Sequence, residues 1–141
     1  MGAVSPVRDD DEGSILPLVL GYALLALAMI LVCVCATDLY IAQKRLDALA
    51  DAAALAGADG FVLVVDEGAA RAELSDEGVR EQAMSVIDAM PTAASLISAT
   101  SPDGVSARVT VAQTWRPPVV SFFVPDWFTL EATATSRTAL R

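Results

Sequence analysis

An uncharged apolar run from Ile15 to Thr37 constrains this chain more than any other feature. At a rise of 1.5 Å per residue, these roughly 23 residues form a helix of about 35 Å, long enough to cross the hydrocarbon core of a bilayer. A single span in lipid must be helical, because only a helix satisfies its own backbone hydrogen bonds there. Ser14 can cap this helix, and Pro17 falls in its first turn, where a missing N–H costs little. The run therefore predicts a transmembrane helix over residues 14–37.

The segment before this helix, residues 1–13, is an acidic leader that carries the cluster Asp9–Glu12. A secretory signal peptide has a basic leader and a shorter apolar core, so the pattern favours a retained anchor. Cleavage after Ala36 is the alternative, and it would release a protein that begins at Thr37. One basic residue precedes the run and two follow it closely, so positive charge alone does not set the orientation.

The helix is expected to continue beyond the membrane as an amphipathic extension over residues 38–58. No Gly or Pro interrupts the sequence between Tyr22 and Ala56, and strong helix formers fill the extension. The pattern predicts one continuous helix from Ser14 to Gly57, about 65 Å long. Its narrow apolar seam can pack on the chain's own domain, on neighbouring subunits, or on both with different faces. The seam consists of Leu39, Ala42, Leu46, Leu49, Ala53 and Ala56.

Residues 59–141 are expected to form a small α+β domain with about three antiparallel strands, one face of which packs on the outer half of the long helix. Alternating apolar residues indicate strands, and an apolar face at helical spacing indicates one further helix. The expected elements are a short strand or helical turn at 61–65, a helix at Asp76–Met90 capped by Ser75, and strands at 96–100, 105–115 and 128–137.

Most of the aromatic residues lie in one proline-containing segment between the last two expected strands. Prolines interrupt a regular strand, so this segment is expected to be a loop. Its aromatic side chains either fill the core between helix and sheet or form an exposed lip that meets a partner or the bilayer surface. The candidate partner residues are Trp115, Phe122, Phe123, Trp127 and Phe128.

The residue content argues against catalysis. The chain has no His, which removes the commonest general base and metal ligand, and it has no phosphate-cradling glycine loop. Cys33 and Cys35 point to nearly opposite sides of a helix and cannot bridge each other. A formal net charge of −9 disfavours nucleic acid as a partner. We therefore expect no enzyme activity, no cofactor or metal, and no small-molecule substrate.

Several residues around the apolar run resemble one known family. Gly13 and Ser14 open the run, a charged residue follows it at Asp38, and the helix then continues into an Ala-Asp-Ala-Ala-Ala-Leu-Ala-Gly segment, Ala50–Gly57. This combination resembles the TadE/TadG-like pilus-assembly family of the Flp (tight adherence) system. The resemblance implies a pilin-like α+β fold and a structural role as a pilin-like or accessory component of pilus assembly or a related secretion process.

The resemblance also implies a location and partners. The protein would be a single-pass component of the bacterial cytoplasmic membrane, with its N-terminus cytoplasmic and its domain outside. Its partners would be other pilin-like subunits and the assembly platform. Prepilin peptidase would be a further partner if it cuts the leader between Gly13 and Ser14. Processed members of the family carry Glu at the position that Leu18 occupies in this chain. A processed pseudopilin and a permanently anchored accessory component are both open, and a membrane-anchored binding module or a secreted protein are the alternatives.

Overall fold

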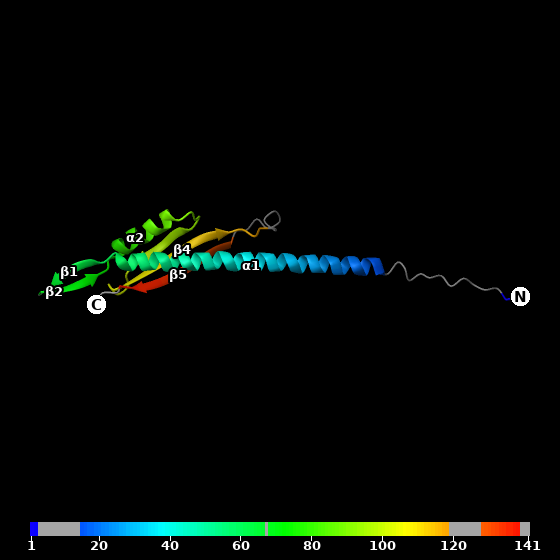
Figure 1. The fold of residues 1–141 in the computed structure, drawn as a ribbon, viewed down its shortest axis with the longest axis horizontal. Helices are drawn as coiled ribbons and strands as arrows, with labels where there is room; N and C mark the ends of the chain where they lie inside the picture. The colour runs from blue at the N-terminus through cyan, green and yellow to red at the C-terminus, as the bar shows by residue number, and fades with distance from the viewer. Residues whose placement is uncertain (3–14, 67, 119–127, 139–141) are drawn as a thin grey trace.

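The computed structural model describes residues 1–2, 15–66, 68–118 and 128–138. One long helix runs past a small domain and extends well beyond it on its N-terminal side (Figure 1). This architecture confirms the α+β class predicted from the sequence. The elements in chain order are α1 (Ile15–Asp59), β1 (Val62–Asp66), β2 (Ala69–Glu73), α2 (Asp76–Ala89), β3 (Ser95–Thr100), β4 (Ser106–Trp115) and β5 (Phe128–Arg137).

Helix α1 has 45 residues and runs without interruption from the apolar run into the domain. At 1.5 Å per residue its length is about 67 Å. The buried residues of α1 all lie between Leu46 and Ala58, so only its C-terminal part belongs to the core of the domain. The same helix therefore performs two different tasks along its length.

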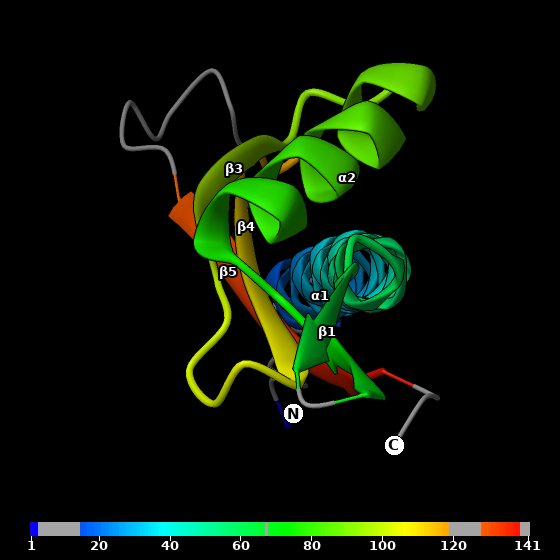
Figure 2. The same cartoon turned by 90° about the vertical axis from the view of Figure 1, so that its left-hand side faces the viewer.

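Three antiparallel strands form the main sheet in the order β3-β4-β5, with β4 in the centre. Val109 of β4 pairs with Ala99 of β3 on one side and with Ala134 of β5 on the other. Helix α1 packs on β4 and β5, and α2 packs mainly against α1 and, within the sheet, against β3. Figure 2, which looks along α1, shows both helices against the sheet. The domain thus has two layers with one core between them.

Small side chains dominate this core. The largest fully buried side chains are Leu46, Val79, Val109 and Val111, and most of their neighbours are alanines. Alanine at a helix surface lets the helix approach a sheet closely, and it also favours the helical conformation. The alanine-rich sequence of α1 therefore serves both the helix and its contact with the sheet.

The structure contains a second, two-stranded sheet that the sequence does not predict. The sequence predicts a short strand or a helical turn at residues 61–65, and the structure has strand β1 paired antiparallel with β2. Strand β2, with the sequence Ala-Ala-Arg-Ala-Glu, contains no β-branched or aromatic residue, so its pattern gave no strand signal. Gly68, with φ of 85°, lies in the turn that allows β2 to fold back along β1.

Candidate assembly surface

Every residue of α1 from Ile15 to Ile30 is exposed in the isolated chain. Within the described residues, α1 is the single helix long and apolar enough to cross a membrane, and no residue of its most apolar stretch is buried inside the protein. Leu24, near the middle of this stretch, is 58% exposed. An apolar surface of this extent must be covered by lipid or by other protein.

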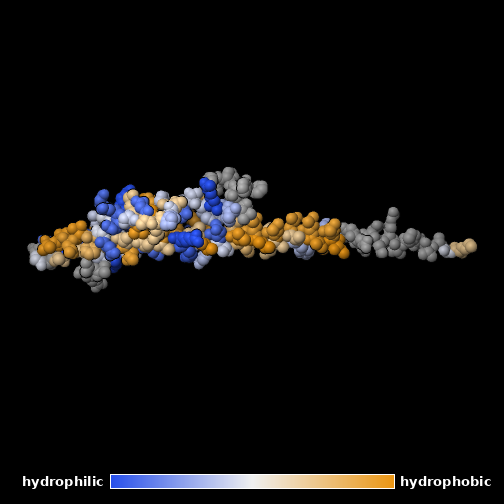
Figure 3. Space-filling view, turned by 45° about the horizontal axis from the view of Figure 1, so that its top comes forward, coloured by the Kyte–Doolittle hydropathy of each residue, from blue (hydrophilic) through white to orange (hydrophobic). Residues whose placement is uncertain are grey.

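Apolar side chains gather at a second place, at the opposite end of the molecule. Figure 3 shows them along the protruding part of α1 and again at the tip formed by the β1–β2 hairpin. Val62, Leu63, Val64 and Val65 are all exposed, with Val65 the most exposed at 72%. A two-stranded hairpin is only marginally stable alone in water, so this tip is a candidate contact for another protein.

The predicted seam of α1 divides between the core and the surface. Leu46, Leu49 and Ala53 are buried in the chain's own domain, Ala42 and Ala56 are half-buried, and Leu39 is exposed. The buried stripe is wider than the seam because α1 contacts both α2 and the sheet. The sequence reasoning missed its further members, which are Ala50, Ala54, Gly57 and Ala58. The buried seam residues are therefore not available to a partner without unfolding the domain.

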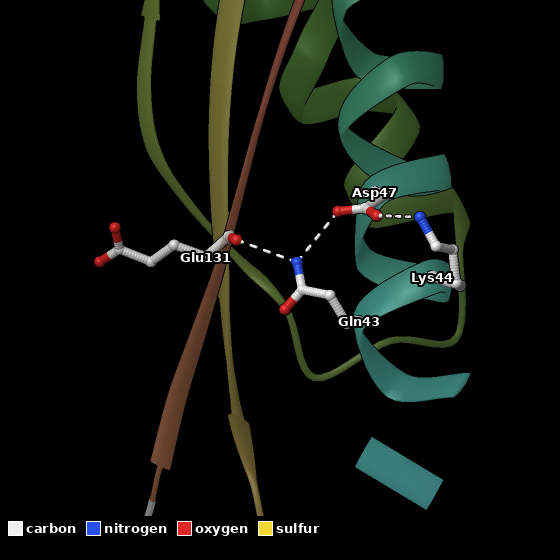
Figure 4. Close-up of polar contacts among 4 residues, drawn as sticks. All are labelled: Gln43, Lys44, Asp47 and Glu131. Atoms are coloured by element: carbon white, nitrogen blue, oxygen red, sulfur yellow. Dashed lines mark hydrogen bonds and ion pairs between the residues drawn. The ribbon is translucent and has the colours of Figure 1, made fainter. Parts of the chain in front are cut away.

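A polar cluster joins α1 to strand β5 of the sheet, at residues of α1 that follow the apolar run in the sequence (Figure 4). The Gln43 side-chain amide donates to the backbone carbonyl of Glu131 in β5 at 3.1 Å and to Asp47 Oδ1 at 2.9 Å. Lys44 Nζ lies 3.1 Å from Asp47 Oδ2. These bonds from Gln43 and Lys44 lower the pKa of Asp47, and Asp47 raises the pKa of Lys44. The cluster thus holds one face of α1 toward β5, while the charged groups of Lys44 and Asp47 remain accessible to solvent.

A second contact joins the end of the sheet to the end of the apolar run. Trp115, the last residue of β4, donates from Nε1 to Asp38 Oδ2 at 2.8 Å. Its ring lies 6.3 Å from the ring of Phe128, with which it pairs across β4 and β5. The contact places two of the five predicted aromatic partner residues together beside α1. The other three, Phe122, Phe123 and Trp127, lie outside the described residues, as do Gly13 and Ser14.

Side chains that could bind a metal or take part in a reaction are sparse elsewhere on the described surface. In residues 15–66, 68–118 and 128–138, no three His, Cys, Asp or Glu side chains lie together as a metal site would require. Cys33 and Cys35 are both free thiols on α1. An open hollow of about 430 Å³ lies where α1 meets the α2–β3 connection, with Arg45, Met90 and Gln113 among its walls. None of these features brings together the groups of a reaction centre.

The fold and its exposed surfaces define a class of protein, namely a small α+β domain carried on a long helix whose N-terminal part is apolar and, among the described residues, exposed. Residues 13–60 match a protein-family model described as putative Flp pilus-assembly TadE/G-like. The match covers all of α1 and confirms the resemblance recognised in the sequence. No curated protein and no solved structure matches the chain. The match supports a role in Flp pilus assembly.

Proposed function

We propose that this protein is a non-catalytic, membrane-anchored component of Flp/Tad-type pilus assembly, either pilin-like or accessory to the assembly machinery. The observation that carries the proposal is that the family match, residues 13–60, spans the whole of helix α1. Nothing in the part of the chain that the structure describes covers α1 from Ile15 to Ile30, and its C-terminal part is the central element of the domain. An anchor that continues rigidly into a folded domain couples events in the membrane to a surface outside it.

The apolar half of α1 is the surface that we assign to the bilayer and to other pilin-like subunits. Side chains such as Val19 and Leu24 are exposed in every direction around the helix, so lipid and neighbouring helices can share it. Helices associate in lipid through close packing rather than through a hydrophobic driving force. Gly21, which has no other group within 4 Å of where its Cβ would stand, offers one such point of close approach.

Cross-linking in cells tests this assignment. A photoreactive amino acid at Val19 or Leu24 should capture other pilin-like subunits or platform proteins. The same group at Arg80, on the exposed side of α2, is the matched control and should capture few or none. If the anchor positions capture no pilus component in cells that assemble pili, the proposed role is wrong.

We also propose the topology that the family resemblance implies, with the N-terminus cytoplasmic and the domain on the outer side of the cytoplasmic membrane. Alkaline phosphatase fused after Arg141 should be active, since it folds only outside the cytoplasm, whereas a fluorescent protein fused there that folds only inside should be dark. The reverse result would invert the topology and remove the domain from the pilus side.

Processing of the leader decides between the two forms of the proposal. The intact mass of the protein extracted from its native membrane shows at which residue the chain begins. A chain that begins at Met1 is expected for a permanent anchor, and a chain that begins at Ser14 is expected for a product of prepilin peptidase. Leu18, in place of the Glu that processed members carry, favours the permanent anchor. A chain that begins at Thr37 would instead mean a secreted protein, and the anchored role would then be wrong.

A further inference from the structure

An apolar groove lies between the end of the membrane-type helix and the indole of Trp115. Its volume is about 340 Å³, and it is open along one side. One wall is α1 itself and the other is the aromatic ring at the end of β4. The lining residues are Leu31, Val32, Cys35, Ala36, Leu39 and Trp115.

The position of the groove along α1 sets its depth in a bilayer. From Ile15 to Ala36 the helix rises about 33 Å, while the hydrocarbon core is about 30 Å thick. Asp38 is the first charged residue after the apolar run, so it must lie outside the hydrocarbon. Leu31 and Val32 lie about 9–10 Å below Asp38 along the helix axis. The groove therefore spans the boundary between the acyl chains and the headgroups.

The indole of Trp115 is oriented as an interfacial tryptophan requires. Its Nε1–H is bonded to Asp38, on the water side, at 2.8 Å. Its ring faces the apolar groove, and Phe128 beside it is 57% exposed. Tryptophan concentrates at this level of a membrane because its ring is apolar and its N–H needs a polar partner.

We propose that the Trp115–Phe128 end of the sheet is a lipid-contacting lip, and that a phospholipid of the adjacent leaflet fills the groove with the upper part of an acyl chain. The floor of the groove is part of the anchor, so the medium that surrounds the anchor at this depth also covers the groove. The lip fixes the height of the domain on the bilayer and limits its tilt. This inference rests on the proposed anchoring of α1.

Tryptophan fluorescence in bilayers tests the proposal. The full chain with Trp127→Phe retains Trp115 alone and is reconstituted in phosphatidylcholine vesicles with bromine atoms on the acyl chains, either near the headgroups or near mid-chain. Trp115 should lose a large part of its emission to the shallow bromines and less to the deep ones. If Trp127→Phe does not fold, the difference in quenching between the wild type and Trp115→Phe gives the same quantity.

Two control chains separate this proposal from the proposed anchoring. With both native tryptophans replaced by Phe, Leu24→Trp reports the bilayer centre and should be quenched most by the deep bromines. In the same background Phe61→Trp reports the far end of the domain and should not be quenched. If Leu24→Trp is quenched and Trp115 is not, the lip is wrong while the anchor stands.

Two further outcomes also overturn the lip. If Trp115 is shielded both from the lipid bromines and from acrylamide in the water, protein fills the groove, with a second copy of the chain as the occupant. If Leu24→Trp escapes the bromines as well, α1 is not in the bilayer, and the anchoring falls together with the lip.

Discussion

Gly60 and Gly78 bring the end of α1 and the first turn of α2 into direct backbone contact. A Cβ on Gly60 would lie 2.8 Å from the carbonyl oxygen of Gly78, and a Cβ on Gly78 would lie 2.7 Å from the carbonyl oxygen of Gly60. Real Cβ atoms do not approach backbone oxygen so closely. The two glycines therefore set the distance between the helices at the end of the domain where both pack on the sheet.

We expect Gly78→Ala to lower the free energy of unfolding by about 1–3 kcal/mol, because the added methyl group must push two backbones apart. The loss should be visible as a lower urea midpoint of the full chain in detergent, followed by tryptophan fluorescence. Gly21→Ala is the matched control, since its Cβ would meet nothing within 4 Å. An unchanged midpoint for Gly78→Ala would show that the helices are not packed this closely.

Local patterns predicted the elements whose residues follow one period. The apolar run and the alanine-rich extension predicted α1, Ser75 predicted the start of α2, and alternation predicted β4 and β5. Ser75 indeed accepts a hydrogen bond from the Gly78 backbone N–H at 3.1 Å. These features are local, so neighbouring residues contain the information that determines them.

Sequence patterns could not predict which distant segments of the chain contact each other. The Trp115–Asp38 bond joins residues separated by 77 positions, and no local period relates them. The sequence predicts the aromatic segment either as part of the core or as an exposed lip, and only the structure places Trp115 beside Asp38. Strand β2 was missed because a turn and a partner strand, rather than its own side chains, determine its conformation.

Asp103 should make the stability of the domain depend on acid pH. It accepts bonds from Ser106 Oγ at 2.8 Å and from the backbone N–H groups of Ser106 and Val105 at 2.6 and 3.1 Å. These bonds, with that of the Ser106 hydroxyl the largest cause, hold the pKa of Asp103 below its ordinary value of 3.8. Because the folded pKa is depressed, the stabilisation is complete above the unfolded pKa and is lost as the pH falls through the folded one.

The corresponding measurement is the urea midpoint of the wild type and of Asp103→Asn between neutral pH and strong acid. The difference between the two proteins should be constant at neutral pH and should shrink as the pH falls below about 4. Asp88→Asn, at an exposed position on α2, should give a midpoint equal to that of the wild type. A difference that grows in acid would contradict the direction of the shift.

Gln43 should control the titration of Asp47. The bond from the Gln43 amide is the largest cause of the lowered pKa of Asp47, and the bond from Lys44 is the next. Gln43→Ala should therefore raise the pKa of Asp47 toward its ordinary value, and so should Lys44→Ala, which removes both a hydrogen bond and a charge. Carboxyl NMR titration of the full chain in detergent checks both. An unchanged pKa in Gln43→Ala would show that the amide bond does not lower the pKa of Asp47.

The β1–β2 hairpin should contribute little to the stability of the domain, because its apolar side chains remain exposed. Replacing Leu63 and Val65 together by Thr keeps the strand propensity and should change the free energy of unfolding by less than about 0.5 kcal/mol per site. Leu46→Ala, which empties a fully buried position, should lower it by about 2–5 kcal/mol and calibrates the assay. If the hairpin contacts another pilus component, the Thr variant will be as stable as the wild type but will assemble fewer pili in cells. A Thr variant that unfolds like Leu46→Ala would instead show that the hairpin packs against the domain.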